Sequence, residues 1–293
     1  MSTTIRLATR SSPLAVVQAK RVQELLLEDS PDLDIELVLV ESHGDRNQTQ
    51  PLREIGGQGV FTKEIQRAVL EGKADIAVHS AKDLPSETPE GLALLCVPER
   101  RDPADVLVGK SLEGLGPGAT VATGSPRRQE LLRSMRPDLN LVELRGNMAT
   151  RLAMPGRDGV DAIVTAAAAL ERLGQEALIT ERLDPLMFVP QVGQGALALE
   201  GRAGDPVAEV LQAIDLVDDH RCLDAERSFL ATLGAGCSVP VGAWCVVDGE
   251  ELEIRSVMFL EETHSIERRV HRGTDPAGLG RTAAHSYPGF EES

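Results

Sequence analysis

The feature that most constrains the fold is an alternation of short apolar runs with helical patterns along the first part of the chain. The runs at 5–8, 35–40 and 76–78 have the length and composition of β-strands, whereas 14–27 and 63–71 have the spacing of helices. Such alternation is typical of proteins in which helices connect the strands of parallel sheets. We therefore expect an α/β protein with largely parallel sheets.

A weak internal repeat divides this α/β region into two copies. Residues 7–13 and 121–128 each lead from a strand into a helix, and residues 75–84 align with residues 161–170. The second copy keeps the apolar frame and loses the polar residues, so the chemistry is concentrated in the first. The repeat predicts two similar lobes; the alternative is that any two strand–helix units look alike at this level.

Two further changes of sequence pattern predict boundaries between structural units of the chain. The turn-rich stretch 98–103 indicates a crossing between lobes. From about residue 222 the helical pattern gives way to alternating strands, which predicts a smaller α+β unit, at 244–247, 252–257 and 266–271. The tail, residues 276–293, is rich in glycine and polar residues and offers no convincing packed helix.

Charge and composition exclude several classes of protein. The 293 residues include 30 Lys and Arg against 46 Asp and Glu, a net charge of −16 that argues against a nucleic-acid or anionic-membrane binder. No apolar run approaches the ~18 residues of a spanning helix, and the N-terminus lacks a signal peptide's apolar core. The four cysteines and six histidines lack zinc-site spacings. We expect a cytoplasmic protein with free thiols and no metal.

Two helix starts have the features of anion sites. Ser12-Pro13 and Ser125-Pro126 each place a hydroxyl at the N-cap and a proline at the first helical position. The free N–H groups and the helix dipole there favour a bound anion. Adjacent arginines add bidentate donors: Arg10, Arg127 and Arg128. Ordinary capping beside solvated arginines is the alternative, but the recurrence in equivalent places favours anion binding.

Other polar residues follow predicted strands. The segment 145–151 contains Arg145 and Arg151, and Arg172 follows the second copy of the repeat. Most arginines are surface charges, but convergence on strand ends argues for a site. Residues Lys82 and Asp83 follow an apolar run, where α/β folds place ligands. The two residues could be a surface ion pair. Alternatively, Asp83 could donate and accept a proton while the Lys82 cation holds an anionic substrate. The residues alone leave both interpretations open.

Two glycine-rich stretches complete the candidate motifs. Residues 56–61 lack the ending of a P-loop and the spacing of a dinucleotide fingerprint, so a mobile loop or lid is the better interpretation. The glycines at 234–242 form a turn that would present Cys237 to solvent. A buried free cysteine is nevertheless the usual case, and it is the alternative here.

Taken together, these residues resemble the hydroxymethylbilane synthase (porphobilinogen deaminase) family. The resemblance is collinear from Ile5 to about Val257. Each matching segment alone is weak evidence for the family, but seven segments in the family's order are specific evidence. The segments are residues 8–15, 56–61, 78–85, 127–129, 145–151, 192–196 and 236–242.

The resemblance implies a fold of two periplasmic-binding-protein-like lobes with a smaller C-terminal α+β domain. Its boundaries would be residues 1–97 plus about 196–214 for lobe 1, 102–190 for lobe 2 and 218–293 for the C-terminal domain. It implies a cytoplasmic transferase that joins four porphobilinogen molecules head to tail, releases ammonia, and frees hydroxymethylbilane by hydrolysis. The chain would grow on one covalent dipyrromethane cofactor. A monomer that hands its product to the next enzyme of tetrapyrrole biosynthesis is expected.

The family's site residues carry over by motif. The expected catalytic residue is Asp83, whose carboxylate would stabilise the cationic azafulvene-like species left by ammonia loss and shuttle a proton. The expected cofactor-binding residues are Cys237, as the thioether attachment, with Ser80, Lys82, Asp83, Ser125, Arg127, Arg128 and Arg145. The expected substrate-binding residues are Arg10, Ser12, Gln18, Phe61, Arg151 and Arg172. The cations among them would neutralise the carboxylates that accumulate on the growing oligomer.

The chain departs from the family pattern in places. Gln58 stands where many relatives have lysine, Gly124 and Pro126 change a common Thr-Ser-Ser-Leu segment, and Ala169 replaces a frequent glycine. The tail does not resemble the family's closing helix. Two other functions therefore stay open: a non-catalytic two-lobed anion-binding protein, and an impaired family member. Stoichiometric binding of porphobilinogen without ammonia release would favour the anion-binding protein.

Overall fold

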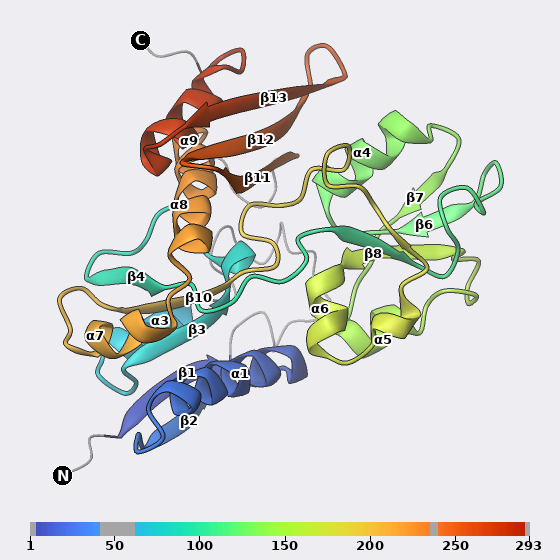
Figure 1. Cartoon of the computed structure of the whole chain (residues 1–293). Helices are drawn as coiled ribbons and strands as arrows, with labels where there is room; N and C mark the ends of the chain where they lie inside the picture. The colour runs from blue at the N-terminus through green and yellow to red at the C-terminus, as the bar shows by residue number, and fades with distance from the viewer. Residues whose placement is uncertain (1–3, 42–61, 235–239, 291–293) are drawn as a thin grey trace. The chain divides into compact units, whose positions relative to one another are not determined.

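The computed structural model of the chain describes residues 4–41, 62–234 and 240–290. Its backbone divides into two compact units (Figure 1). Unit 1 comprises residues 1–100 and 196–221, and unit 2 comprises residues 101–195 and 222–293. The first passage between them, after Arg100, falls inside the turn-rich stretch 98–103.

Unit 1 is built on a mixed five-stranded sheet with the strand order β2-β1-β3-β10-β4. Its strands are β1 (Ile5–Arg10), β2 (Ile35–Val40), β3 (Ile76–Ser80), β4 (Leu92–Cys96) and β10 (Leu197–Arg202). Its helices are α1 (Pro13–Asp29), α3 (Lys63–Leu70), η1 (Ala81–Asp83), α7 (Val207–Leu211), η3 (Gln212–Ile214) and the start of α8 (Val217–Thr232). Helix α1 buries Val22 and Leu26 with Ile76 on one face of the sheet, and α3 buries Ile65 and Val69 on the other.

The first part of unit 2 has a second five-stranded sheet, with the order β7-β6-β8-β5-β9. Its strands are β5 (Asp105–Val108), β6 (Thr120–Ala122), β7 (Asn140–Val142), β8 (Ala162–Ala166) and β9 (Glu181–Arg182). Its helices are α4 (Pro126–Met135), α5 (Met148–Leu152), α6 (Ala167–Arg172) and η2 (Glu176–Leu178). The two sheets share one topology, in which β7, β6, β8, β5 and β9 take the places of β2, β1, β3, β10 and β4.

The internal repeat is confirmed at the level of strand register. Leu7 of β1 pairs with Ile76 of β3, and Val121 of β6 pairs with Ala162 of β8, which is the correspondence the sequence alignment predicts. Carboxylates just before β3 and just before β8 bind the neighbouring strands β1 and β6 in the same way. Asp75 accepts a hydrogen bond from the Arg6 backbone N–H, and Asp161 accepts one from that of Thr120, both at 2.9 Å.

The expectation of largely parallel sheets is wrong. Each sheet has two parallel and two antiparallel pairings, because β10 runs antiparallel to β3 and β4, and β5 runs antiparallel to β8 and β9. Both strands follow a passage of the chain from one unit into the other rather than a crossover helix within their own sheet. A crossover helix is what makes consecutive strands parallel, so these two strands are free to run the other way.

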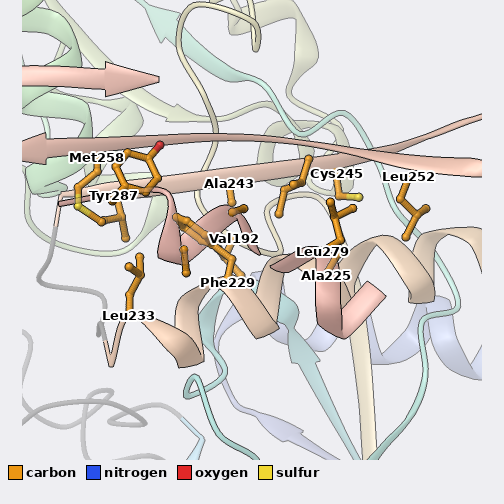
Figure 2. Close-up of a cluster of buried hydrophobic side chains, with 14 of the residues drawn as sticks. Val192, Ala225, Phe229, Leu233, Ala243, Cys245, Leu252, Met258, Leu279 and Tyr287 are labelled. Carbon is orange, nitrogen blue, oxygen red and sulfur yellow. The ribbon is translucent and has the colours of Figure 1, made fainter. Parts of the chain in front are cut away.

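The C-terminal part of unit 2 is the predicted α+β region. Antiparallel strands β11 (Val241–Asp248), β12 (Glu251–Leu260) and β13 (Ser265–Gly273) contain all three predicted strand segments. The rest of α8 and helix α9 (Pro276–His285) pack on this sheet around a buried cluster (Figure 2), in which the rings of Phe229 and Tyr287 meet edge to face. The α/β class with a smaller α+β region is therefore confirmed; the exact domain boundaries stay a prediction.

The expectation that the tail has no packed helix is also wrong. Asp275 caps α9, and Pro276 occupies its first position. Gly280, which weakens a helix by about 1 kcal/mol relative to alanine, serves close packing here: a Cβ on it would lie 2.3 Å from the Ala225 carbonyl oxygen of α8. Tyr287 is fully buried, with its hydroxyl 3.0 Å from that of Ser256 and Arg269 over its ring.

Candidate functional site

A pocket in unit 1 gathers polar residues from the carboxyl ends of β1 and β3. Arg10 ends β1, Ser80 ends β3, and Asp83 lies in the 3₁₀ turn η1 that follows directly. The lining residues are Arg10, Ser12, Leu14, Ala15, Gln18, Thr62, Ile65, Val78, His79, Ser80 and Asp83. The repeat thus places its polar copy where an α/β sheet is expected to bind a ligand.

The start of α1 forms one wall of this pocket. Ser12 is the N-cap, its Oγ accepts from the Ala15 N–H at 3.4 Å, and the first turn holds no acidic residue. Gln18, buried one turn further on, donates from Nε2 to the Ser80 Oγ at 2.7 Å. This bond fixes the hydroxyl at the end of β3 against α1. The wall therefore presents backbone N–H groups, hydroxyls and a dipole that favour an anion.

Asp83 and Lys82 are held by the short turn η1. The Ala81 N–H donates to the Ala196 carbonyl at 3.0 Å, and the Leu84 N–H closes the turn on the Ala81 carbonyl at 3.2 Å. Both side chains are half-buried, and Asp83 lines the pocket whereas Lys82 is not among its lining residues. The structure thus brings Arg10, Ser12, Gln18, Ser80 and Asp83 together in one pocket.

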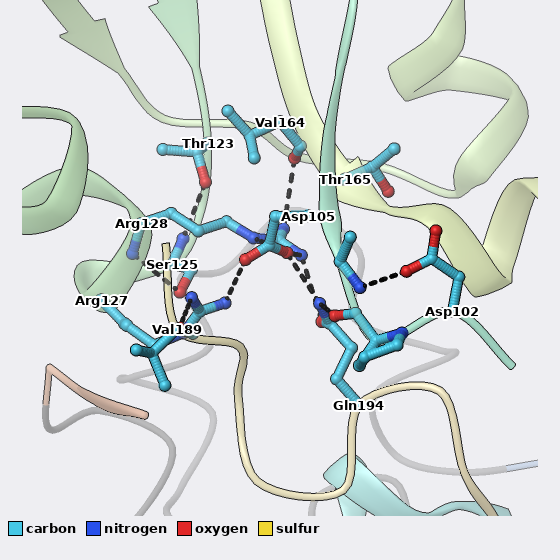
Figure 3. Close-up of polar contacts among 12 residues, drawn as sticks. Asp102, Asp105, Thr123, Ser125, Arg127, Arg128, Val164, Thr165, Val189 and Gln194 are labelled. Carbon is cyan, nitrogen blue, oxygen red and sulfur yellow. Dashed lines mark hydrogen bonds and ion pairs between the residues drawn. The ribbon is translucent and has the colours of Figure 1, made fainter. Parts of the chain in front are cut away.

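In unit 2 the arginine pair surrounds a buried carboxylate (Figure 3). Asp105 of β5 is fully buried and lies 2.7 Å from Arg127 Nη2 and 2.6 Å from Arg128 Nη2. Gln194 Nε2 donates to the same carboxylate at 2.9 Å. Burial on its own would raise the pKa of Asp105, but the two guanidinium charges and the amide lower it to about 2.

The two arginines of this cluster differ in exposure. Arg127 is 3% exposed, and its Nη1 donates to the Val189 carbonyl at 2.6 Å, so its guanidinium is occupied within the protein. Arg128 follows the N-cap Ser125 at the start of α4 and is less completely covered. The cluster of two cations and one anion carries a net charge of +1. Arg128 and Ser125 are thus more exposed than Arg127, whose guanidinium contacts both Asp105 and the Val189 carbonyl.

The remaining predicted arginines of unit 2 are anchored locally. Arg145 Nη2 lies 2.7 Å from Glu143 Oε1, and Arg151 Nε donates to the Gly146 carbonyl at 2.8 Å. Arg172 Nη2 donates to the Gly195 carbonyl at 2.7 Å, which ties α6 to the turn before β10. These contacts fix the side chains but do not bring them into the cluster around Asp105.

Two predicted site residues lie outside the described residues: Cys237 and Phe61. The glycine-rich stretch 56–61, with Gln58, lies outside them as well. The other cysteines, Cys96, Cys222 and Cys245, are free and buried, and burial raises the pKa of the Cys96 thiol. Their expected structural role agrees with this burial.

Sequence reasoning missed two buried carboxylates that lie next to the predicted site residues. Asp105 stands next to the apolar run 106–108, and Glu200 follows the apolar run 196–199. A charged residue in a buried strand needs a partner, so its position within an apolar run is the signal that would have found both. Glu200 is fully buried and lies 3.2 Å from His79, a residue of the unit 1 pocket.

Two family models match nearly the whole chain. The porphobilinogen deaminase dipyromethane cofactor binding domain matches residues 5–209, and the porphobilinogen deaminase C-terminal domain matches residues 220–287. No helix within the described residues is long and apolar enough to cross a membrane.

Curated relatives are similar over the same extent. A porphobilinogen deaminase of Roseiflexus castenholzii is 43% identical over 291 residues, which cover 97% of this chain and 95% of the relative. One from Xanthomonas axonopodis pv. citri is 40% identical over 301 residues, covering 96% and 99%. Among solved structures, the periplasmic VFT2 domain of Bordetella pertussis BvgS is 17% identical with a TM-score of 0.42, covering 77% of this chain and 92% of that domain.

Proposed function

The chain belongs to the porphobilinogen deaminase family, and on that basis we propose which of its residues carry out the reaction. It is a transferase of tetrapyrrole biosynthesis that condenses porphobilinogen on a covalently bound dipyrromethane cofactor. The observation that supports the assignment is the unit 1 pocket, where Asp83 lies among Arg10, Ser12 and Ser80. The alternative of a non-catalytic anion-binding protein is not supported by this membership.

The donor set of the described residues fits a dipyrromethane. That group has pyrrole N–H donors and acidic side chains, and when bound it supplies the pyrrole carbon to which the first porphobilinogen is joined. A half-buried carboxylate suits the N–H donors, and the arginines, serines and helix starts suit the acids. We assign its binding to Ser80, Lys82, Asp83, Ser125, Arg127, Arg128 and Arg145, with attachment at Cys237.

Asp83 is assigned the central chemical role. Loss of ammonia from porphobilinogen leaves a cation, and a carboxylate fixed by η1 at the pocket wall stabilises it more strongly than water does. The start of α1, with Arg10 and Ser12, is assigned to the carboxylates of the incoming substrate, and Gln18 holds Ser80 in place. Arg151, Arg172 and Phe61 complete the proposed substrate-binding set.

The test is Asp83→Asn, with Glu87→Gln as the matched control at an exposed residue just beyond η1. We expect Asp83→Asn to lower the rate of ammonia release from porphobilinogen by at least about 100-fold, and the control to keep the parent rate. Intact mass checks that each protein carries its cofactor. Near-normal turnover by Asp83→Asn would remove the assignment, and porphobilinogen binding without ammonia release by the parent would identify an impaired family member.

We also infer that the protein is a cytoplasmic monomer that passes hydroxymethylbilane to the next enzyme of the pathway. Cys96, Cys222 and Cys245 are buried thiols that form no disulfide within the described part of the chain, which supports a reducing compartment. Light scattering of the purified protein tests the monomer: a mass near 31.4 kDa is expected, and twice that value contradicts it.

A further inference from the structure

The segment 189–194 of unit 2 has no part in the mechanism above, although it contains most of the glycine motif 192–196. It lies between β9 and β10 and ends just before the chain passes back into unit 1, after Gly195. Its residues contact two parts of unit 2. One is the arginine cluster around Asp105, and the other is the C-terminal part, which carries the proposed attachment residue Cys237.

Both ends of the segment contact the arginine cluster (Figure 3). At one end, the Val189 carbonyl accepts a hydrogen bond from Arg127 Nη1 at 2.6 Å. At the other end, Gln194 is fully buried; its Nε2 donates to Asp105 Oδ1 at 2.9 Å, and its Oε1 accepts from Arg128 Nη2 at 3.5 Å. Gln194 therefore binds both the carboxylate and a guanidinium of the cluster.

The middle of the segment contacts the C-terminal part of unit 2. The Gln194 N–H closes a turn on the Gln191 carbonyl at 2.9 Å, and Gly193, the third residue of that turn, has a φ of +72° that favours glycine. The Val192 side chain lies in the buried cluster formed by α8, α9 and the three-stranded sheet (Figure 2). The turn thus allows Val192 and Gln194 to contact different parts of the unit.

Glu226 joins the segment to both elements that flank Cys237 in the sequence. It is fully buried on α8, the helix before Cys237, and its Oε2 accepts from the Gly193 N–H at 2.7 Å. Its Oε1 accepts from the Cys245 N–H at 2.8 Å, in β11, the strand after Cys237. One carboxylate therefore ties this helix and this strand to the segment, through hydrogen bonds of the strong, charge-assisted kind.

Close packing at the start of β11 adds another contact with the segment. A Cβ on Gly242 would lie 2.5 Å from the Pro190 carbonyl oxygen and 2.9 Å from Arg127 Cδ. Glycine at this position lets the strand approach the backbone of the segment and the side chain of a cluster arginine. Hydrogen bonds and packing together hold α8 and β11 against the segment, and the segment against the cluster.

We propose that the segment 189–194 positions Cys237 relative to the arginine cluster, with Gln194 and Glu226 as the positioning residues. A cofactor that is attached at one point and held by its acidic side chains at others needs both sets of protein groups at matching positions. Reaction at a thiol depends steeply on such placement. The inference rests on the proposed function, and it adds residues that act on attachment of the cofactor rather than on condensation.

The test measures how fast apo-protein gains its cofactor. Apo-protein from cells that make no porphobilinogen is incubated with porphobilinogen, and its covalent mass excess is followed with time at a temperature where every variant is folded by circular dichroism. Gln194→Leu keeps a similar side-chain volume and removes the hydrogen bonds to Asp105 and Arg128. We expect it to gain the excess about 10- to 100-fold more slowly than the parent.

Glu226→Gln is the second variant, and it should slow the gain as well, because an amide has only one oxygen to accept from Gly193 and Cys245. Since Gln194 and Glu226 act through one segment, the double variant should gain the excess at about the rate of the slower single variant. If Gln194→Leu does not fold, Glu226→Gln decides alone.

The matched control is Tyr287→Phe, which loses a buried hydrogen bond of the same unit, to Ser256, outside the segment. It should lower the melting temperature and keep the parent's rate of gain. Folded variants that gain the excess as fast as the parent overturn the inference, and so does a control that is slowed as much as they are, because loss of stability alone then explains the delay. A parent that gains no excess overturns the proposed function instead, and this inference with it.

Discussion

Removal of the Asp105 charge should destabilise unit 2 strongly. Asp105→Asn leaves the guanidinium groups of Arg127 and Arg128 without the carboxylate that both now contact, and breaking a buried ion pair in this way costs about 3–5 kcal/mol. The lowered pKa of Asp105 gives a second value for the stability that this charge contributes. A fall from 3.8 to about 2 corresponds to about 2 kcal/mol of stability at neutral pH.

The direction of the pH dependence follows from that fall. Because the pKa of Asp105 is lower in the folded protein than in the unfolded chain, the stabilisation is complete above about pH 5. It is lost as the pH falls through 3.8 towards 2. The variant has no charge at this position, so its stability should lack this contribution to the acid dependence.

Denaturant unfolding at pH 7 and at about pH 2.5 measures both effects. The matched control is Asp138→Asn, because Asp138 pairs with Arg136 in the same unit but at the surface, where a pair is worth at most about 1 kcal/mol. A loss for Asp105→Asn no larger than that of the control would refute the reasoning that the Asp105 cluster is a main support of unit 2.

Two further predictions concern close packing. Gly242→Ala in β11 should cost about 1–3 kcal/mol of unfolding free energy, because its Cβ would lie 2.5 Å from the Pro190 carbonyl oxygen. The control is Gly116→Ala, where an added Cβ would have nothing within 4 Å. Equal stabilities of the two variants would contradict the close packing at Gly242. Tyr287→Ala should cost about 3–5 kcal/mol and Tyr287→Phe about 1 kcal/mol in the same measurement. A negligible loss for Tyr287→Ala would show that the segment after α9 does not support the fold.

The repeat could be read from the sequence because it is local. A strand, an N-cap serine and a proline occupy neighbouring positions, and the apolar frame of 75–84 survives in 161–170. The directions of β5 and β10 could not be read, since they depend on how the chain returns to a sheet far along the sequence. The helix α9 was missed because its glycines lower helix propensity, and the contact of Gly280 with α8 that compensates them is tertiary.

The candidate site likewise contains residues that could be predicted from the sequence and residues that could not. Residues next to strand ends, such as Ser80 and Asp83, follow from motif and topology together. The partners Asp105 and Glu200 could not be assigned, because each meets its partner through side chains 22 or more residues away. Arg127 shows the consequence: its motif predicts a cofactor-binding side chain, but its buried contacts with Asp105 and Val189 could not be read from that motif.

The measurement that tests the central claim most directly is the intact mass of the purified protein beside that of Cys237→Ala. The account predicts a covalent excess of two linked pyrrole units on the parent chain, present as purified or after incubation with porphobilinogen, and no excess on the variant. A parent that stays unmodified after that incubation, or a variant that carries the same excess, would contradict it.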